Sequence, residues 1–150
     1  MTRNPLLLCV LLVAIALPAN AAVRLTTAVN GEIVEVAWPQ SAFPIRYTPD
    51  QRLINVLPGG PAALQQAFQA WQDVPNARVS FEANGPTTGL KAGQDGVNTV
   101  TLADDLFANQ RAIAITTNWD TNGSLTESDI QVDASLINSN YNVHQAMTHE

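Results

Sequence analysis

The chain has 150 residues, of which 46% are hydrophobic and 13% charged, and its formal net charge is −6 at pH 7. This acidic balance argues against nucleic acid or an anionic membrane surface as a partner. The single cysteine, Cys9, lies in the N-terminal apolar run, so the rest of the chain can form neither a disulfide scaffold nor a cysteine-ligated zinc site.

The first residues have the pattern of a secretory signal peptide. Arg3 gives a positive start, an apolar run over residues 6–17 follows, and Pro18-Ala19-Asn20-Ala21 contains an Ala-x-Ala cleavage site. The apolar run is short for a membrane span, and small residues rather than stop-transfer charges flank it. We therefore expect residues 1–21 to be a signal peptide and the mature protein to be secreted or periplasmic, without membrane contact after cleavage.

In the mature part we expect an arm followed by alternating strands and helices. Residues 22–41 form the expected N-terminal arm, and residues 43–47 form the first core strand, closed by Thr48-Pro49-Asp50. Apolar residues recur at helical spacing over residues 61–73, where Pro61 suits a first turn. Residues 77–83 alternate in the manner of a strand.

Three further strands and a second helix complete the predicted order. The segments are a loop over residues 85–96, strands over 97–102, 112–117 and 125–134, and a helix from Tyr141 onward. The turn signal Asn122-Gly123 makes the last two strands an antiparallel pair, one of which should be an edge strand. This order predicts an α/β (α+β) fold with a mixed sheet and helices packed on it.

Five short segments occur together in a characteristic order. They are Ala67-Phe68-Gln69-Ala70-Trp71, Val79-Ser80-Phe81-Glu82, Asp95-Gly96-Val97-Asn98, Gly123-Ser124-Leu125-Thr126-Glu127-Ser128-Asp129-Ile130 and His149-Glu150. Over residues 38–150 they resemble the bacterial matrixin-like branch of the metzincin zinc peptidases. The resemblance implies a twisted, mostly parallel sheet with one antiparallel edge strand and two helices, and an incomplete catalytic domain over residues 42–150.

The last two residues would carry the chemistry of such an enzyme. His149 is the candidate first Zn²⁺ ligand, and Glu150 is the candidate general base that takes a proton from zinc-bound water. In the zinc-binding helix of these enzymes a second histidine follows one helical turn later. We therefore expect the remaining ligands beyond Glu150, and we expect this fragment to be inactive by itself. The alternative is a polar His-Glu pair on the surface of an ordinary helix.

The other residues of this predicted helix have simpler interpretations. His144 precedes His149 by five residues, which turns it about 140° away from the metal-facing side of a helix, so we expect it to be exposed. Val143, Ala146 and Met147 fit the buried stripe of an amphipathic helix.

A short β-branched segment is the candidate substrate-binding strand. It consists of Ala112, Ile113, Ala114, Ile115 and Thr116. An extended protein or peptide substrate could add to its edge through backbone hydrogen bonds. The alternative is a plain edge strand covered by a loop.

Two clusters of acidic and amide side chains could bind Ca²⁺ through oxygen ligands. They are Asp104-Asp105 and residues 120–122, and neither matches a full calcium-loop pattern, so turn and cap roles are the alternative.

Three functions stay open at this point. The first is a secreted, monomeric zinc endopeptidase of the metzincin kind, and the second is a secreted non-catalytic α/β binding domain or inactive relative. The third keeps the zinc motif but takes a distant Glu as the last ligand.

Overall fold

The structure is a computed structural model that describes residues 24–104 and 114–134. The expected signal peptide, the first two residues of the candidate substrate segment (Ala112 and Ile113), and the predicted helix with His144, His149 and Glu150 lie outside these ranges. Within the described ranges, no helix has the length and apolar character needed to cross a membrane.

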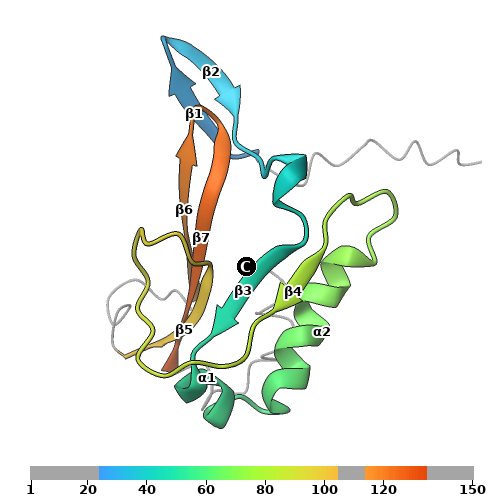
Figure 1. Ribbon diagram of the computed structural model, residues 1–150, viewed down its shortest axis with the longest axis vertical. Coiled ribbons are helices and arrows are strands. Elements are labelled where there is room, and N and C mark those ends of the chain that lie inside the picture. Colours follow the sequence, from blue (N-terminus) through green and yellow to red (C-terminus); the bar gives the residue numbers. More distant parts are fainter. Residues whose placement is uncertain (1–23, 105–113, 135–150) are drawn as a thin grey trace, which may run out of the picture.

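A five-stranded mixed sheet organises these residues (Figure 1). Its strands are β3 (Ile45–Pro49), β4 (Phe81–Ala83), β5 (Thr99–Ala103), β6 (Ala114–Thr121) and β7 (Ser124–Asp133). Their order is β4-β3-β5-β7-β6, in which the first four are parallel neighbours and β6 alone pairs in an antiparallel way. The fold class expected from the sequence, a mostly parallel sheet with one antiparallel edge strand and two helices, is thereby confirmed.

Two helices precede β4 in the chain. Helix α1 (Gln51–Val56) begins after Asp50, whose carboxylate accepts a hydrogen bond from the Arg52 N–H at 2.9 Å and so caps the helix. Helix α2 (Gly60–Gln72) agrees with the predicted helix over residues 61–73 and has its proline in the first turn. The sequence did not predict α1, because its six residues are too few to establish a helical period.

The hydrophobic core lies between these helices and one face of the sheet. It contains Tyr47, Leu53, Ile54, Leu57, Leu64, Ala67, Val100, Ile130 and Val132. Tyr47 of β3 stacks on Phe68 of α2 with 4.0 Å between the ring centroids, and Phe68 also contacts Phe81 of β4. These aromatic contacts fix α2 against the β3–β4 side of the sheet.

The predicted N-terminal arm contains a separate two-stranded hairpin. Strands β1 (Thr26–Val29) and β2 (Glu32–Glu35) pair with each other, and a short 3-10 helix, η1 (Gln40–Ala42), leads into β3. The hairpin stands beyond the turn between β6 and β7 (Figure 1). The segment that follows the hairpin contacts this turn, because the Ala37 N–H donates to the Gly123 carbonyl at 3.0 Å.

Two strand boundaries differ from the sequence-based expectation. The strand predicted over residues 77–83 is regular only in β4, because the turn after α2 includes Asn76 at a positive φ of 69° and the chain is extended only later. Strand β6 reaches Thr121 rather than residue 117, because its antiparallel pairing with β7 continues to the turn.

Candidate functional site

The candidate substrate segment lies at an edge of the sheet. Ala114, Ile115 and Thr116 are the first three residues of β6, whereas Ala112 and Ile113 fall outside the described residues. Strand β6 pairs with β7 on one side, and no strand in residues 24–104 or 114–134 pairs with its other side. An edge of this kind offers backbone groups to which an extended peptide can add.

The turn between β6 and β7 fixes the register of this edge strand. Asn122 and Gly123 both have positive φ, 54° and 83°, as a two-residue hairpin turn requires. Gly123 donates its N–H to the Asp120 carboxylate at 3.0 Å, and a Cβ at Gly123 would lie 2.8 Å from the Glu35 carbonyl oxygen. Glycine is therefore required there by space as well as by conformation.

An irregularity in the ladder lies close to this turn. The register shifts between Trp119 and Asp120, and the Thr126 hydroxyl donates to the Trp119 carbonyl at 3.2 Å. The extra residue, Thr126, lies in β7, and such a bulge bends the strand that contains it and increases the local twist.

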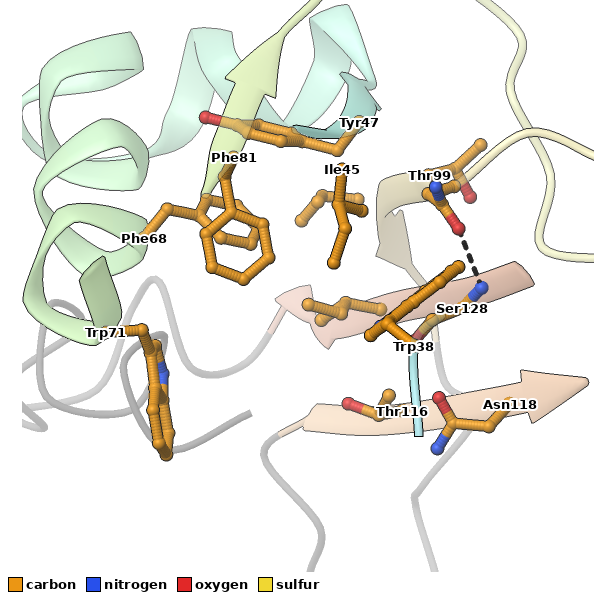
Figure 2. Close-up of a pocket in the computed structure, with 13 residues that line it drawn as sticks. Trp38, Ile45, Tyr47, Phe68, Trp71, Phe81, Thr99, Thr116, Asn118 and Ser128 are labelled. Carbon is orange, nitrogen blue, oxygen red and sulfur yellow. Dashed lines mark hydrogen bonds between the residues drawn. The ribbon is translucent and has the colours of Figure 1, made fainter. Parts of the chain in front are cut away.

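One face of β6 borders a cavity of about 250 Å³ (Figure 2). The cavity is lined by Trp38, Ile45, Tyr47, Phe68, Trp71, Phe81, Asn98, Thr99, Val100, Thr116, Asn118, Ser128 and Ile130. The rings of Tyr47, Phe68 and Phe81 form one side, and the hydroxyl and amide groups of Thr116 and Asn118 lie on the other. The cavity therefore combines an apolar wall with a polar wall beneath the edge strand.

None of the residues that line this cavity carries a charge at neutral pH. Burial raises the pKa of the Tyr47 hydroxyl above its usual 10.0, so this group stays protonated under physiological conditions. The cavity thus favours apolar or neutral polar groups.

Two buried carboxylates fasten the chain before β5 to β7. Asp129, 0% exposed, accepts hydrogen bonds at 2.8 Å from the N–H groups of Gly93 and Thr99 and from the Thr99 hydroxyl. Glu127, 2% exposed, accepts from the N–H groups of Asp95 and Gly96, the latter at 2.6 Å. These donors replace the water that each carboxylate loses on burial.

The two carboxylates point away from the helices. They alternate along β7 with Ser128 and Ile130, which line the cavity, and successive side chains of a strand point to opposite faces. Residues 93–96 therefore lie over the second face of the sheet. Sequence reasoning assigned these two residues no role of their own; the available signal was a pair of acids at alternate positions of a predicted core strand.

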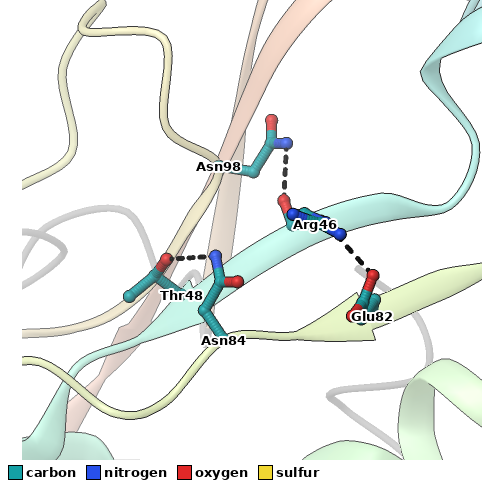
Figure 3. A network of polar contacts seen from close by, with 5 residues as sticks. All are labelled: Arg46, Thr48, Glu82, Asn84 and Asn98. Carbon is teal, nitrogen blue, oxygen red and sulfur yellow. Dashed lines mark hydrogen bonds and ion pairs between the residues drawn. The ribbon is translucent and has the colours of Figure 1, made fainter.

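Asn98 lines the cavity and joins three strands; Figure 3 shows its contact with Arg46 of β3. Its side-chain amide donates to the Arg46 carbonyl at 2.8 Å, and its side-chain oxygen accepts from the Ser128 N–H at the same distance. Its own carbonyl accepts from the Thr48 N–H. These hydrogen bonds extend the β3–β5 pairing by one residue before β5 and link β3 to β7 through the Asn98 side chain.

The described residues do not provide a metal site. Residues 24–104 and 114–134 contain no group of three or more His, Cys, Asp or Glu that could hold a metal ion. His149 and Glu150 lie outside these ranges, so the structure does not describe the residues proposed to bind zinc. The zinc assignment therefore stays a prediction.

The predicted calcium ligands within the described part have other partners. Asp104 forms an ion pair with Arg52 at 2.6 Å, and Asp120 caps the turn through Gly123, whereas Asp105 lies outside the described residues. The contact of Asp120 is of the turn and cap kind named as the alternative, whereas the ion pair of Asp104 was not predicted; a calcium site stays a prediction.

Comparisons with protein-family models, with curated proteins and with solved structures find no match to this chain. Its function is therefore argued from its residues and its fold.

Proposed function

We propose that the chain is the front part of a secreted zinc-dependent endopeptidase. The observation that supports this best is the sheet order: the antiparallel strand of the five-stranded sheet, β6, is an edge strand, and its partner β7 is the last strand in the described residues, which end 15 positions before His149 in the sequence. A substrate edge and a metal-ligating helix then occupy neighbouring positions in the chain. The resemblance to the matrixin-like metzincins noted in the sequence agrees with this arrangement.

In this proposal the residues have separate roles. An extended peptide adds to β6 at Ala114, Ile115 and Thr116, continuing through Ala112 and Ile113, so that its backbone is held largely independently of its side chains. His149 is a zinc ligand and Glu150 accepts a proton from the attacking water. Bound zinc supplies Lewis acidity and a water of lowered pKa. The other ligands would be residues that follow Glu150 in the complete protein.

The cavity beneath β6 and β7 supports the same proposal. Its uncharged lining, with an aromatic wall and a polar wall next to β6, suits the apolar and neutral side chains of a peptide added to that strand.

The experiment uses the complete reading frame, expressed as the secreted protein. We expect about one tightly bound zinc ion per molecule and cleavage of casein. The His149→Ala variant should lose the zinc, whereas Glu150→Gln should keep it and lose activity by a factor of roughly 10² to 10⁴. A complete protein without bound zinc or cleavage would refute the endopeptidase.

A non-catalytic binding domain is the second candidate. It is favoured by the edge strand β6, to which an extended peptide can add through backbone hydrogen bonds without any metal. In that case the complete protein would bind extended peptides without zinc. Equilibrium dialysis against zinc therefore separates the two candidates.

A further inference from the structure

Two hairpin turns in this protein have the same sequence and conformation. Asn30-Gly31 joins β1 to β2 and Asn122-Gly123 joins β6 to β7. The φ angles are 51° and 86° in the first turn and 54° and 83° in the second. Any difference in their chemistry must therefore come from their surroundings.

An Asn-Gly pair can lose its side-chain amide without an enzyme. The glycine backbone nitrogen attacks the asparagine side-chain carbonyl carbon, a new C–N bond forms, and the side-chain nitrogen leaves as ammonia. Water then opens the resulting succinimide to give aspartate or isoaspartate. In a left-handed asparagine, with ψ of about +47°, the attacking nitrogen lies on the far side of the Cα–C bond from the side chain. The turn must open before the bond can form.

The turn at Asn122 is restrained against this opening. Its attacking nitrogen, the Gly123 N, donates a hydrogen bond to Asp120 at 3.0 Å. The Gly123 carbonyl accepts from the Ala37 N–H at 3.0 Å, and the Glu35 backbone packs against Gly123. The turn also closes strands of 8 and 10 residues within the main sheet.

The turn at Asn30 has none of these restraints. Strands β1 and β2 have 4 residues each, belong to a separate two-stranded sheet and contain no buried residue. Around Gly31 there is open space, and among the described residues its N–H has no hydrogen-bond acceptor. Short exposed hairpins open at a low free-energy cost compared with strands of the core sheet.

We propose that Asn30 is a site of spontaneous deamidation and that Asn122 is its protected counterpart. The product places a new carboxylate two residues from Glu32, and in the isoaspartate form it adds a methylene group to the main chain of the turn. Such a turn no longer fits the two-residue hairpin, so the modification loosens the β1–β2 hairpin. The proposal is independent of the peptidase assignment.

The test is peptide mapping by mass spectrometry of the folded full-length chain during incubation at pH 8. Asn30 should deamidate at least about tenfold faster than Asn122, since the rate follows the fraction of opened turn. In strong denaturant the two rates should agree within about a factor of two, because both pairs are then unfolded Asn-Gly sequences. Equal rates in the folded protein would overturn the proposal.

A matched variant tests the assigned protection. Asp120→Ala removes the acceptor of the Gly123 N–H and should accelerate deamidation at Asn122 severalfold while the rate at Asn30 is unchanged. An unchanged rate at Asn122, measured in a variant that circular dichroism shows to be folded, would contradict the protective role of Asp120.

Discussion

The two faces of the sheet are held in different ways. On the helix face, apolar side chains such as Tyr47, Val100 and Val132 pack against α1 and α2. On the opposite face, buried side chains such as Thr99, Glu127 and Asp129 are polar, and the carboxylates bind backbone N–H groups of residues 93–99. One layer is held by non-directional burial, the other by directional hydrogen bonds.

This difference predicts different responses to substitution. A cavity on the helix face weakens contacts shared by both helices and the sheet, so its cost falls on the whole fold. A lost carboxylate on the opposite face leaves particular buried N–H groups without an acceptor, so besides lowering the global stability it favours local opening of the covering segment. Global unfolding and local hydrogen exchange should therefore report differently on the two faces.

The largest effect is expected for Asp129→Ala. The variant removes the acceptor of three hydrogen bonds, two of them from the N–H groups of Gly93 and Thr99, and should lower the free energy of unfolding by about 4 kcal/mol. Amide hydrogen exchange at Gly93 and Thr99 should accelerate more than exchange in α2. The control Asp129→Asn keeps one acceptor oxygen and should cost less. Uniform acceleration across the protein would argue against a locally concentrated cost.

Leu53→Ala is the matching change on the helix face. Leu53 is 0% exposed in α1, and its truncation should lower the free energy of unfolding by about 3 kcal/mol through lost burial and a residual cavity. Urea denaturation measures this change. The control Leu53→Met conserves volume and should cost less than about 1.5 kcal/mol. In Leu53→Ala, hydrogen exchange at Gly93 should increase no more than exchange elsewhere in the protein. A selective increase at Gly93 would contradict the expected difference between the two faces.

Glu127→Gln should have a smaller effect than either of these. Glutamine keeps one oxygen acceptor but presents an NH₂ group to the N–H donors of Asp95 and Gly96, so we expect a loss of about 2 kcal/mol. Hydrogen exchange at Gly96 should increase while exchange at Gly93, held by Asp129, changes little. Equal changes at both amides would show that the two carboxylates act as one unit.

The sequence predicted the apolar face better than the polar one. Helix α2 and the β6–β7 hairpin follow from helical periodicity and from the Asn122-Gly123 turn, both of which are local signals. The buried positions of Glu127 and Asp129 depend on a segment about 30 residues earlier in the chain folding over β7, which no local pattern specifies. The edge position of β6 was predicted as one of two possibilities, because pairing order is a tertiary property.

The candidate site was predictable only in part for the same reason. Residues 114–116 were identified from their composition and lie at the sheet edge, whereas substrate binding there stays a prediction. The cavity beneath them combines residues from β3, α2, β5, β6 and β7, so it requires the folded arrangement. His149 and Glu150 rest on sequence evidence alone.

The smallest effect, and one of opposite sign, is expected for Thr101→Val on the polar face. Thr101 is 2% exposed on β5, and its hydroxyl is the one buried side-chain polar atom without a hydrogen-bond partner in residues 24–104 and 114–134. Valine has a similar shape and removes an unsatisfied group, so the free energy of unfolding should rise by about 1 kcal/mol. The matched control is Thr99→Val, in which the hydroxyl donates to Asp129 at 2.8 Å and its loss should destabilise the protein by about 1 kcal/mol. Urea denaturation of both variants measures the difference. If Thr101→Val were the more destabilising of the two, the Thr101 hydroxyl would have a hydrogen-bond partner in the folded protein. The hydrogen bonds on this face would then include more than those between the two carboxylates and residues 93–99.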